Sequence, residues 1–212
     1  MNVNKELQKY IEEKIFPNYK KNDLGHNLNH IKHVIDRSMK FAQSVPEINY
    51  DMVYTIAAYH DIGHYIDAKN HEKIGSEILL ADKKLKDFFS DEEIKKMAEA
   101  VYDHRASLEY EPRSIYGKIV SSADRNTIVD VPLKRTYEYR IKHSPNSSIA
   151  EIIEESRQHI IKKFGNNGYA NEKMYFEDLE YKIFLKEIAL LANDEKKFKK
   201  KYILINKIES VN

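Results

Sequence analysis

The sequence predicts an all-α protein. Apolar residues recur three and four positions apart along most of the chain, which is the spacing of one face of a helix. Two capping boxes, Ser90 with Glu93 and Ser148 with Glu151, mark the starts of helices. We find no segment with the period of two that a half-buried strand shows. We therefore expect a helical bundle with additional helices toward its C-terminal end.

The first part of the chain contains most of the predicted bundle. The helices expected there cover residues 4–16, 28–44, 51–61, 71–80, 82–89, 91–104 and 114–127. Pro17 and Pro46 end the first two, because proline lacks the N–H that a helix interior requires. The third helix, capped by Asn49 or Asp51, is apolar nearly all round. That composition predicts a central position in the core.

The last third of the chain has a different character. We expect helices at residues 132–142, 148–164, 171–192 and 194–209. Only His143 and His159 of the nine histidines fall there, and neither belongs to a motif. We therefore divide the chain into a core at residues 1–130 and an extension at 131–212 that packs on the same domain. The extension is interpreted as scaffold, or as a lobe for specificity or for homo-oligomerisation.

Composition excludes several classes of function. The 35 Lys and Arg residues nearly cancel the 34 Asp and Glu residues, so no basic excess suits nucleic acid. The absence of cysteine excludes disulfides, thiol nucleophiles and Cys-zinc sites. The N-terminus lacks the apolar core of a signal peptide, and no apolar run is long enough to span a bilayer. We expect a soluble cytoplasmic protein with no membrane or nucleic-acid partner.

Histidines are concentrated in the first half of the chain. Seven of the nine lie at positions 26, 30, 33, 60, 64, 71 and 104. The pair His60-Asp61 ends the apolar run 52–59, where burial costs several kcal/mol unless both groups are paired or bind a metal. His64 follows His60 by four residues and shares its helical face. We interpret this stretch as one half of a metal site.

Two other helix ends can supply the remaining ligands. His30 lies early in its helix and Asp124 late in another, and bundles bring such ends together around an ion. Alone, His30 would be interpreted as a core histidine, and Asp124 as a carboxylate paired with Arg125. Their joint occurrence with His60-Asp61 favours a metal. The mixed nitrogen and oxygen set suits Mn, Fe, Zn, Co or Ni better than calcium.

The pattern His30…His60-Asp61…Asp124 resembles the HD-domain superfamily of metal-dependent phosphohydrolases. The resemblance covers residues 20–130 and is carried by four segments, which are 29–34, 59–64, 71–79 and 119–125. Asn29 and His33 stand where the family's first motif commonly has Asp and Arg. The resemblance implies a helical HD-type bundle.

The resemblance also implies a ligand set. By it, a first ion is held by His30, His60, Asp61 and Asp124. A second ion would take His71 and His104, with Asp61 bridging. The binuclear branch usually has two adjacent histidines where this chain has Asp103-His104, so the number of ions stays open between one and two.

The implied reaction is hydrolysis of a phosphomonoester or nucleotide by a metal-activated water. Asp61 would orient the nucleophile, and His64 would contact the phosphate or protonate the leaving oxygen. Lys69, Arg105 and Arg125 lie next to motif residues and are candidates for binding phosphate oxygens. An ordinary salt bridge is the alternative for each of these three residues.

Two other classes of function remain open. One is a di-iron oxygenase of HD type, which uses the same ligand set with both ions present. The other is a non-catalytic sensor domain that binds a metal or nucleotide.

His26, four residues before His30, either lines the mouth of the site or is a solvated loop histidine.

Overall fold

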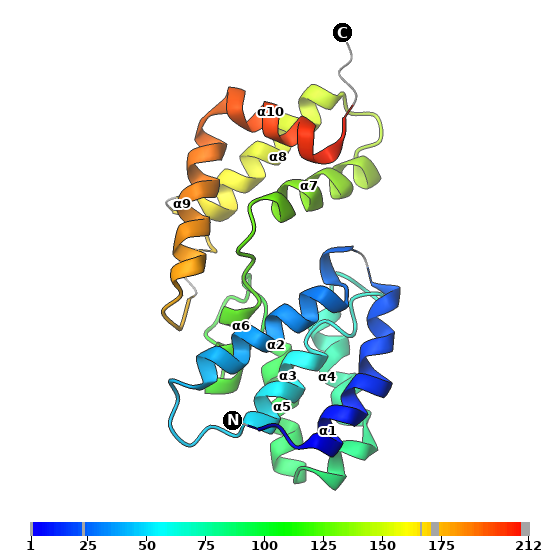
Figure 1. The fold of residues 1–212 in the computed structure, drawn as a ribbon. Helices are drawn as coiled ribbons and strands as arrows, with labels where there is room; N and C mark the ends of the chain where they lie inside the picture. The colour runs from blue at the N-terminus through cyan, green and yellow to red at the C-terminus, as the bar shows by residue number, and fades with distance from the viewer. Residues whose placement is uncertain (1, 23, 166, 171–173, 209–212) are drawn as a thin grey trace. The chain divides into compact units, whose positions relative to one another are not determined.

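The computed structural model of the chain describes residues 2–22, 24–165, 167–170 and 174–208 (Figure 1). Within these residues every regular element is a helix, which confirms the predicted fold class. The chain forms two compact units, Met1–Asp124 and Arg125–Asn212. In the described part, none of the helices combines the length and apolar character that crossing a membrane requires.

The first unit contains six α-helices among its described residues. They are α1 Lys5–Tyr10, α2 Leu28–Ala42, α3 Tyr50–Tyr59, α4 His71–Ala81, α5 Asp91–Tyr102 and α6 Ile115–Ala123. Short 3₁₀ turns lie at Phe16–Lys21, Leu24–His26 and Lys83–Asp87, and a π-helical turn at Ile11–Ile15. The predicted helices of this part are therefore present, with shifted ends.

Helix α3 lies at the centre of the first unit, as its composition predicts. Its residues from Met52 to Tyr59 are all buried, and α2, α5 and α6 pack against it (Figure 1). Helix α4 packs mainly on α5. The cap of α3 is Asn49, whose side chain accepts hydrogen bonds from the backbone N–H groups of Asp51 and Met52. The central helix thus delivers its C-terminal end, and His60 with it, to the interior.

Two predicted helix boundaries in this unit differ most from the structure and are wrong. Helical backbone does not stop at Pro17, because the π-helical turn continues into the 3₁₀ turn Phe16–Lys21. Pro17 lies at the start of that turn, where a missing N–H leaves no bond unmade. Phe16 and Tyr19 are buried there, so packing keeps the segment wound. Helix α6 also ends at Ala123 rather than at 127.

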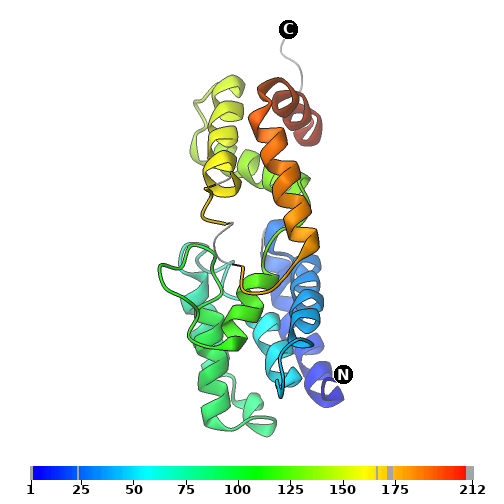
Figure 2. The same cartoon turned by 90° about the vertical axis from the view of Figure 1, so that its left-hand side faces the viewer.

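The second unit is a bundle of its own (Figure 2). Its helices are α7 Asp130–His143, α8 Ile149–Phe164, α9 Leu179–Asn193 and α10 Glu195–Asn206. Leu133, Ile160, Phe184 and Phe198 are fully buried or nearly so in its hydrophobic core. The Tyr202 hydroxyl lies 2.8 Å from Ser156 Oγ within this core. The unit therefore has the apolar interior of a separate folding unit, and its packing on the first unit stays a prediction.

The starts of α8, α9 and α10 follow their capping residues, which are Ser148, Asp178 and Asp194. Ser148 and Glu151 form the predicted capping box of α8. Helix α9 begins later than predicted, because Asp178 is its N-cap and accepts a hydrogen bond from Tyr181 N. The predicted helical start at 171–173 and the predicted end at 209 lie outside the described residues.

Candidate metal centre

Six candidate ligands converge where five helices of the first unit begin or end. His30 lies in the first turn of α2, His60 is the C-cap of α3 with Asp61 directly after it, and Asp124 is the C-cap of α6. His71 is the first residue of α4, and His104 follows the C-cap of α5. Each candidate ligand thus lies at or beside the end of a helix.

The first group of ligand atoms comprises His30, His60 and Asp124, with Asp61 beside them. Nε2 of His30 lies 3.2 Å from Oδ1 of Asp124 and 3.4 Å from Oδ2 of Asp61. Nε2 of His60 lies 3.3 Å from the same Asp61 oxygen. This arrangement brings together all four residues that the sequence assigns to a first ion.

The second group comprises Asp61, His71 and His104, and all three residues are buried. Here the other carboxylate oxygen of Asp61, Oδ1, lies 3.3 Å from Nε2 of His71 and 3.6 Å from Nε2 of His104. The two Asp61 oxygens therefore face different sets of nitrogens. That is the position of a carboxylate between two cation sites.

Backbone carbonyls fix the orientation of three of the rings. Nδ1 of His60 lies 2.8 Å from Ala57 O, and Nδ1 of His104 lies 2.6 Å from Val101 O. Nδ1 of His71 lies 3.0 Å from Ala68 O, likewise three residues earlier in the chain. A carbonyl only accepts, so Nδ1 carries the proton in each ring. In the neutral ring Nε2 is then a lone pair aimed into the site, as in metal-ligating histidines.

The donor set fits a divalent metal. Among the described residues, Nε2 of His30 and Nε2 of His60 are buried without a hydrogen-bond partner. Both face the Asp61 carboxylate, and Nε2 of His60, whose Nδ1 carries the ring proton, is an acceptor like that carboxylate. Lone pairs and carboxylate oxygens that face one another are compatible only with a proton or a cation between them. Nitrogen and oxygen ligands in this mixture suit a transition metal.

The close approach of imidazoles and carboxylates in the first group shifts their pKa values. Burial alone lowers the pKa of His30, but the carboxylates of Asp124 and Asp61 outweigh it and raise that pKa to about 9. Burial raises the pKa of Asp124, yet His30 and His60 outweigh burial and hold it well below its usual value. The metal-free group therefore keeps its carboxylates ionised and a proton on His30 at neutral pH.

The pKa values of the two histidines in the second group are shifted in opposite directions. Burial and the neighbouring charge of His104 lower the pKa of His71 to about 4. Burial also lowers the pKa of His104, but Asp61 reverses the direction and raises it. The pKa of Asp61 itself is held well below its usual range, because His60, His104 and His30 outweigh the effect of burial. A proton shared by this pair is therefore held by His104 rather than by His71.

A glycine allows the two halves of the site to approach. A Cβ at Gly63 would lie 2.7 Å from His71 O and 2.8 Å from Cβ of Ile74. The turn after Asp61 therefore touches the start of α4 through a residue without a side chain. This close contact brings the segment that carries Asp61 against the helix start that carries His71.

His64 lies at the edge of the site and does not join either group. Its ring stacks on His26 with centroids 3.6 Å apart, and it lies 5.4 Å from the ring of His71. Asn22 links the two loops, donating through Nδ2 to His26 O and to Asp61 O. His26 is thus packed against a site histidine, and the stack is a feature that the sequence pattern did not predict.

Asp103 lies outside both ligand groups. It is fully buried and accepts hydrogen bonds from Nε and Nη2 of Arg113 at 2.9 and 2.8 Å. It also accepts from the backbone N–H of Arg113 and from the Tyr110 hydroxyl. Asp103, which stands where the binuclear branch usually has a histidine, therefore closes the 105–113 loop. Of the pair Asp103-His104, it is His104 that faces Asp61.

The three candidate phosphate-binding residues are placed differently. Nη1 of Arg105 lies 3.0 Å from Oε1 of Glu72 and donates to Lys69 O at 2.9 Å, so Arg105 links its loop to the start of α4. Lys69 is exposed, and Arg125 is buried. For Arg105 this contact is the salt bridge that the sequence left as the alternative to a phosphate contact.

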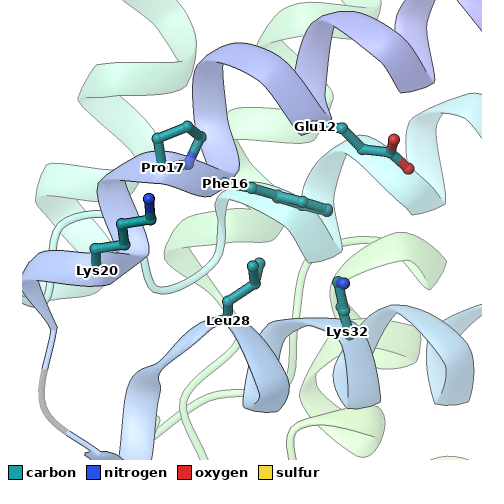
Figure 3. Close-up of a pocket in the computed structure, with 6 residues that line it drawn as sticks. All are labelled: Glu12, Phe16, Pro17, Lys20, Leu28 and Lys32. Carbon is teal, nitrogen blue, oxygen red and sulfur yellow. The ribbon is translucent and has the colours of Figure 1, made fainter.

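A hollow of about 400 Å³ lies on another face of α2 (Figure 3). It is lined by Glu12, Phe16, Pro17, Lys20, Leu28 and Lys32. Leu28 and Lys32 lie one turn apart on α2, whereas His30 is about 200° around the helix from Leu28. None of the candidate ligands lines this hollow, so it is separate from the metal centre.

Comparisons with known proteins give a family match and a similar solved structure. No curated protein matches the chain. A solved structure of a predicted HD superfamily hydrolase from an uncultured Thermotogales bacterium is similar, with 20% identity and a TM-score of 0.46 over 74% of this chain and 86% of that one. The family described as the HD domain matches residues 27–127, a segment that contains all six candidate ligands. Residues 27–127 of this chain are therefore an HD domain, and the superfamily predicted from the four sequence segments is confirmed.

Proposed function

We propose that the chain is a metal-dependent phosphohydrolase that cleaves a phosphomonoester or a nucleotide. The observation that carries the proposal is the division of the Asp61 carboxylate, with Oδ2 toward His30 and His60 and Oδ1 toward His71 and His104. A buried carboxylate shared by two sets of imidazoles suits a site for two cations. Phosphate ester hydrolysis is a reaction that two-metal sites support.

The side chains of this chain have separate tasks in such a reaction. A divalent ion bound here would polarise a phosphoryl oxygen and lower the pKa of a coordinated water. Asp61, ionised and buried, would accept a hydrogen bond from the attacking water and orient it. The backbone contacts of His60, His71 and His104 keep their rings from turning during the reaction.

His64 is the proposed acid for the leaving oxygen. It lies next to His71 without belonging to a ligand group, so its ring is near the reacting centre but not needed for the ion. The stack with His26 restrains its ring. Lys69 remains a candidate to contact the phosphate because it is exposed on the loop before α4. Arg125 is retained as a second candidate.

The test is a screen of phosphate esters and nucleotides with the Mn(II)-loaded protein, accompanied by elemental analysis of the protein as purified. We expect release of inorganic phosphate from at least one class, and its loss in His60→Ala and Asp61→Ala with helical content retained. His143→Ala is the matched control, because His143 is an exposed histidine of the second unit. Full activity in metal-free Asp61→Ala would refute the proposal.

One observation favours a second candidate, a di-iron oxygenase of HD type. That reaction would need all six ligands, and His30, His60, Asp61, Asp124, His71 and His104 do converge. The discriminating experiment loads the protein with Fe(II) under anaerobic conditions, counts the iron and then measures oxygen uptake. Two irons with oxygen consumption coupled to substrate loss would favour the oxygenase, and phosphate release without oxygen uptake would favour the hydrolase.

A further inference from the structure

Arg37 is a buried cation on α2 that the sequence pattern does not single out. Its residue surface is only 6% exposed. Nε donates to Ala123 O at 3.0 Å, and Nη2 donates to Ser122 O at 3.4 Å. These carbonyls belong to the last turn of α6, where backbone oxygens lack partners within the helix. A cation at this end of a helix also interacts favourably with the helix dipole.

The same helix carries a candidate ligand on the same side. Arg37 follows His30 by seven residues, which is two turns of an α-helix. Nε2 of His30 lies 3.2 Å from Oδ1 of Asp124, the residue directly after Ala123. Helix α2 therefore contacts the end of α6 at two points, one on the Asp124 carboxylate and one on the carbonyls just before it.

The last turn of α6 sets the direction of the Asp124 carboxylate. Asp124 is the C-cap of the helix, and its backbone N–H donates to Val120 O at 2.8 Å. The backbone of Asp124 thus follows the turn that Arg37 holds. If that turn frays, the carboxylate loses its fixed position opposite His30.

We infer that Arg37 is a positioning residue for the ion of the first group, acting through Ser122 O and Ala123 O on Asp124. The inference rests on the proposed metal site. The planar guanidinium reaches two carbonyls at once, which a lysine ammonium on a flexible stem does not reproduce. Arg37→Lys should therefore weaken binding of the ion at the first group, and Arg37→Met should weaken it further.

The test measures the affinity for Mn(II) alone, by competition with a chromophoric chelator, in two backgrounds. His71→Ala leaves the first group intact, and His30→Ala leaves the second. In the first background we expect Arg37→Lys to weaken binding about tenfold and Arg37→Met about a hundredfold, the range for residues that orient ligands. In the second background, neither substitution should change the affinity of any ion that remains.

Ile35→Ala serves as the control for general destabilisation. Ile35 is a buried residue of α2 that lies about 200° around the helix from Arg37. Its truncation creates a cavity without touching the α6 carbonyl contacts, so Mn(II) affinity of the folded protein should stay at the parent value. Circular dichroism gives the folded fraction, and Arg37→Lys decides the question if Arg37→Met does not fold.

The outcomes separate this inference from the proposed function. Unchanged Mn(II) affinity in Arg37→Lys and Arg37→Met, with the parent binding normally, refutes the role of Arg37 alone. An equal loss in Ile35→Ala, or an equal loss at the second group, also refutes it, because either result indicates a structural effect. Failure of the unsubstituted protein to bind Mn(II) refutes the metal site itself.

Discussion

Nε2 of His71 lies 3.2 Å from Nε2 of His104. Each ring has its Nδ1 against a backbone carbonyl, so in the neutral form both Nε2 atoms are acceptors. Two lone pairs at this distance repel unless a proton or a cation lies between them. A proton between them is held by His104 rather than by His71, because the pKa of His104 is raised and the pKa of His71 falls to about 4. A metal ion between them would displace that proton.

The first prediction is that a single substitution can remove the ion of one ligand group and leave the ion of the other in place. We expect the unsubstituted protein to bind two Mn(II) ions and His71→Ala to bind one. In Asp61→Asn, the affinity for each ion should fall by more than about a hundredfold. The Asp61 carboxylate faces both groups, with Oδ2 toward His30 and His60 and Oδ1 toward His71, whereas His71 belongs to the second group alone. Elemental analysis after equilibrium dialysis measures the stoichiometry.

His159→Ala is the control for this series, because His159 lies in the second unit and should leave both ions in place. Retention of two ions by Asp61→Asn would contradict the shared position of Asp61. A single ion in the unsubstituted protein, lost in His30→Ala and kept in His71→Ala, would restrict the site to the first group.

The candidate ligands, which the structure brings together, could be named from the sequence because their residue types carry the signal. A His-Asp pair at the end of the buried helix α3 is costly without a partner, and four motifs in order supply the partners. Arg37 and Arg113 carry no such signal. Arg37 bonds to carbonyls 85 and 86 residues away, and Arg113 to Asp103 across a loop. Backbone acceptors have no side-chain identity, so no spacing rule finds them.

The helix types were predictable and some of their ends were not. The capping boxes at Ser90 and Ser148 fixed two starts, since their hydrogen bonds are local. Past Tyr10 the helix widens into a π-helical turn and then tightens into a 3₁₀ turn from Phe16, although the apolar spacing predicts a regular helix that stops at Pro17. Packing of buried Phe16 and Tyr19 decides that segment, and packing is not visible in local sequence.

The second prediction is that metal affinity rises with pH beyond neutrality. The pKa of His30 is raised to about 9, so binding of an ion to the first group at pH 7 must displace a proton from that ring. The apparent Mn(II) affinity should therefore increase up to about tenfold per unit between pH 7 and 9. Isothermal titration in buffers of different ionisation enthalpy measures the released protons. An affinity that levels off above pH 6.5 would contradict the raised pKa.

The third prediction has the opposite sign and concerns the metal-free protein. A histidine whose folded pKa lies above its unfolded value of 6.5 stabilises the fold fully below pH 6.5. This contribution is lost as the pH rises through about 9, and it amounts to about 3 kcal/mol at most for a shift of this size. Urea unfolding in chelator at pH 6, 7.5 and 9 measures the decline. His30→Gln should flatten it, and an unchanged slope in that variant would exclude His30 as the cause.

The fourth prediction concerns the Asp103–Arg113 pair. Removing Arg113 leaves a fully buried carboxylate with fewer donors, so Arg113→Met should lower the free energy of unfolding by about 1–3 kcal/mol. Asp103→Asn combined with Arg113→Met should cost less than the sum of the two changes, because the buried charge is then absent. Denaturant titrations of the four proteins give the coupling, and strict additivity would show that the pair does not stabilise the loop.

The last prediction tests His64 as the acid for the leaving oxygen. A general acid matters most when the leaving group is a poor one. His64→Gln should therefore reduce kcat about a hundredfold or more for an alkyl phosphate, but only severalfold for 4-nitrophenyl phosphate, whose leaving group needs little protonation. Mn(II) stoichiometry should stay at the parent value, because His64 belongs to neither ligand group. His26→Phe preserves an aromatic ring against His64 and should keep more activity than His26→Ala. An equal loss on both esters in His64→Gln would assign His64 to binding the phosphate rather than to proton transfer.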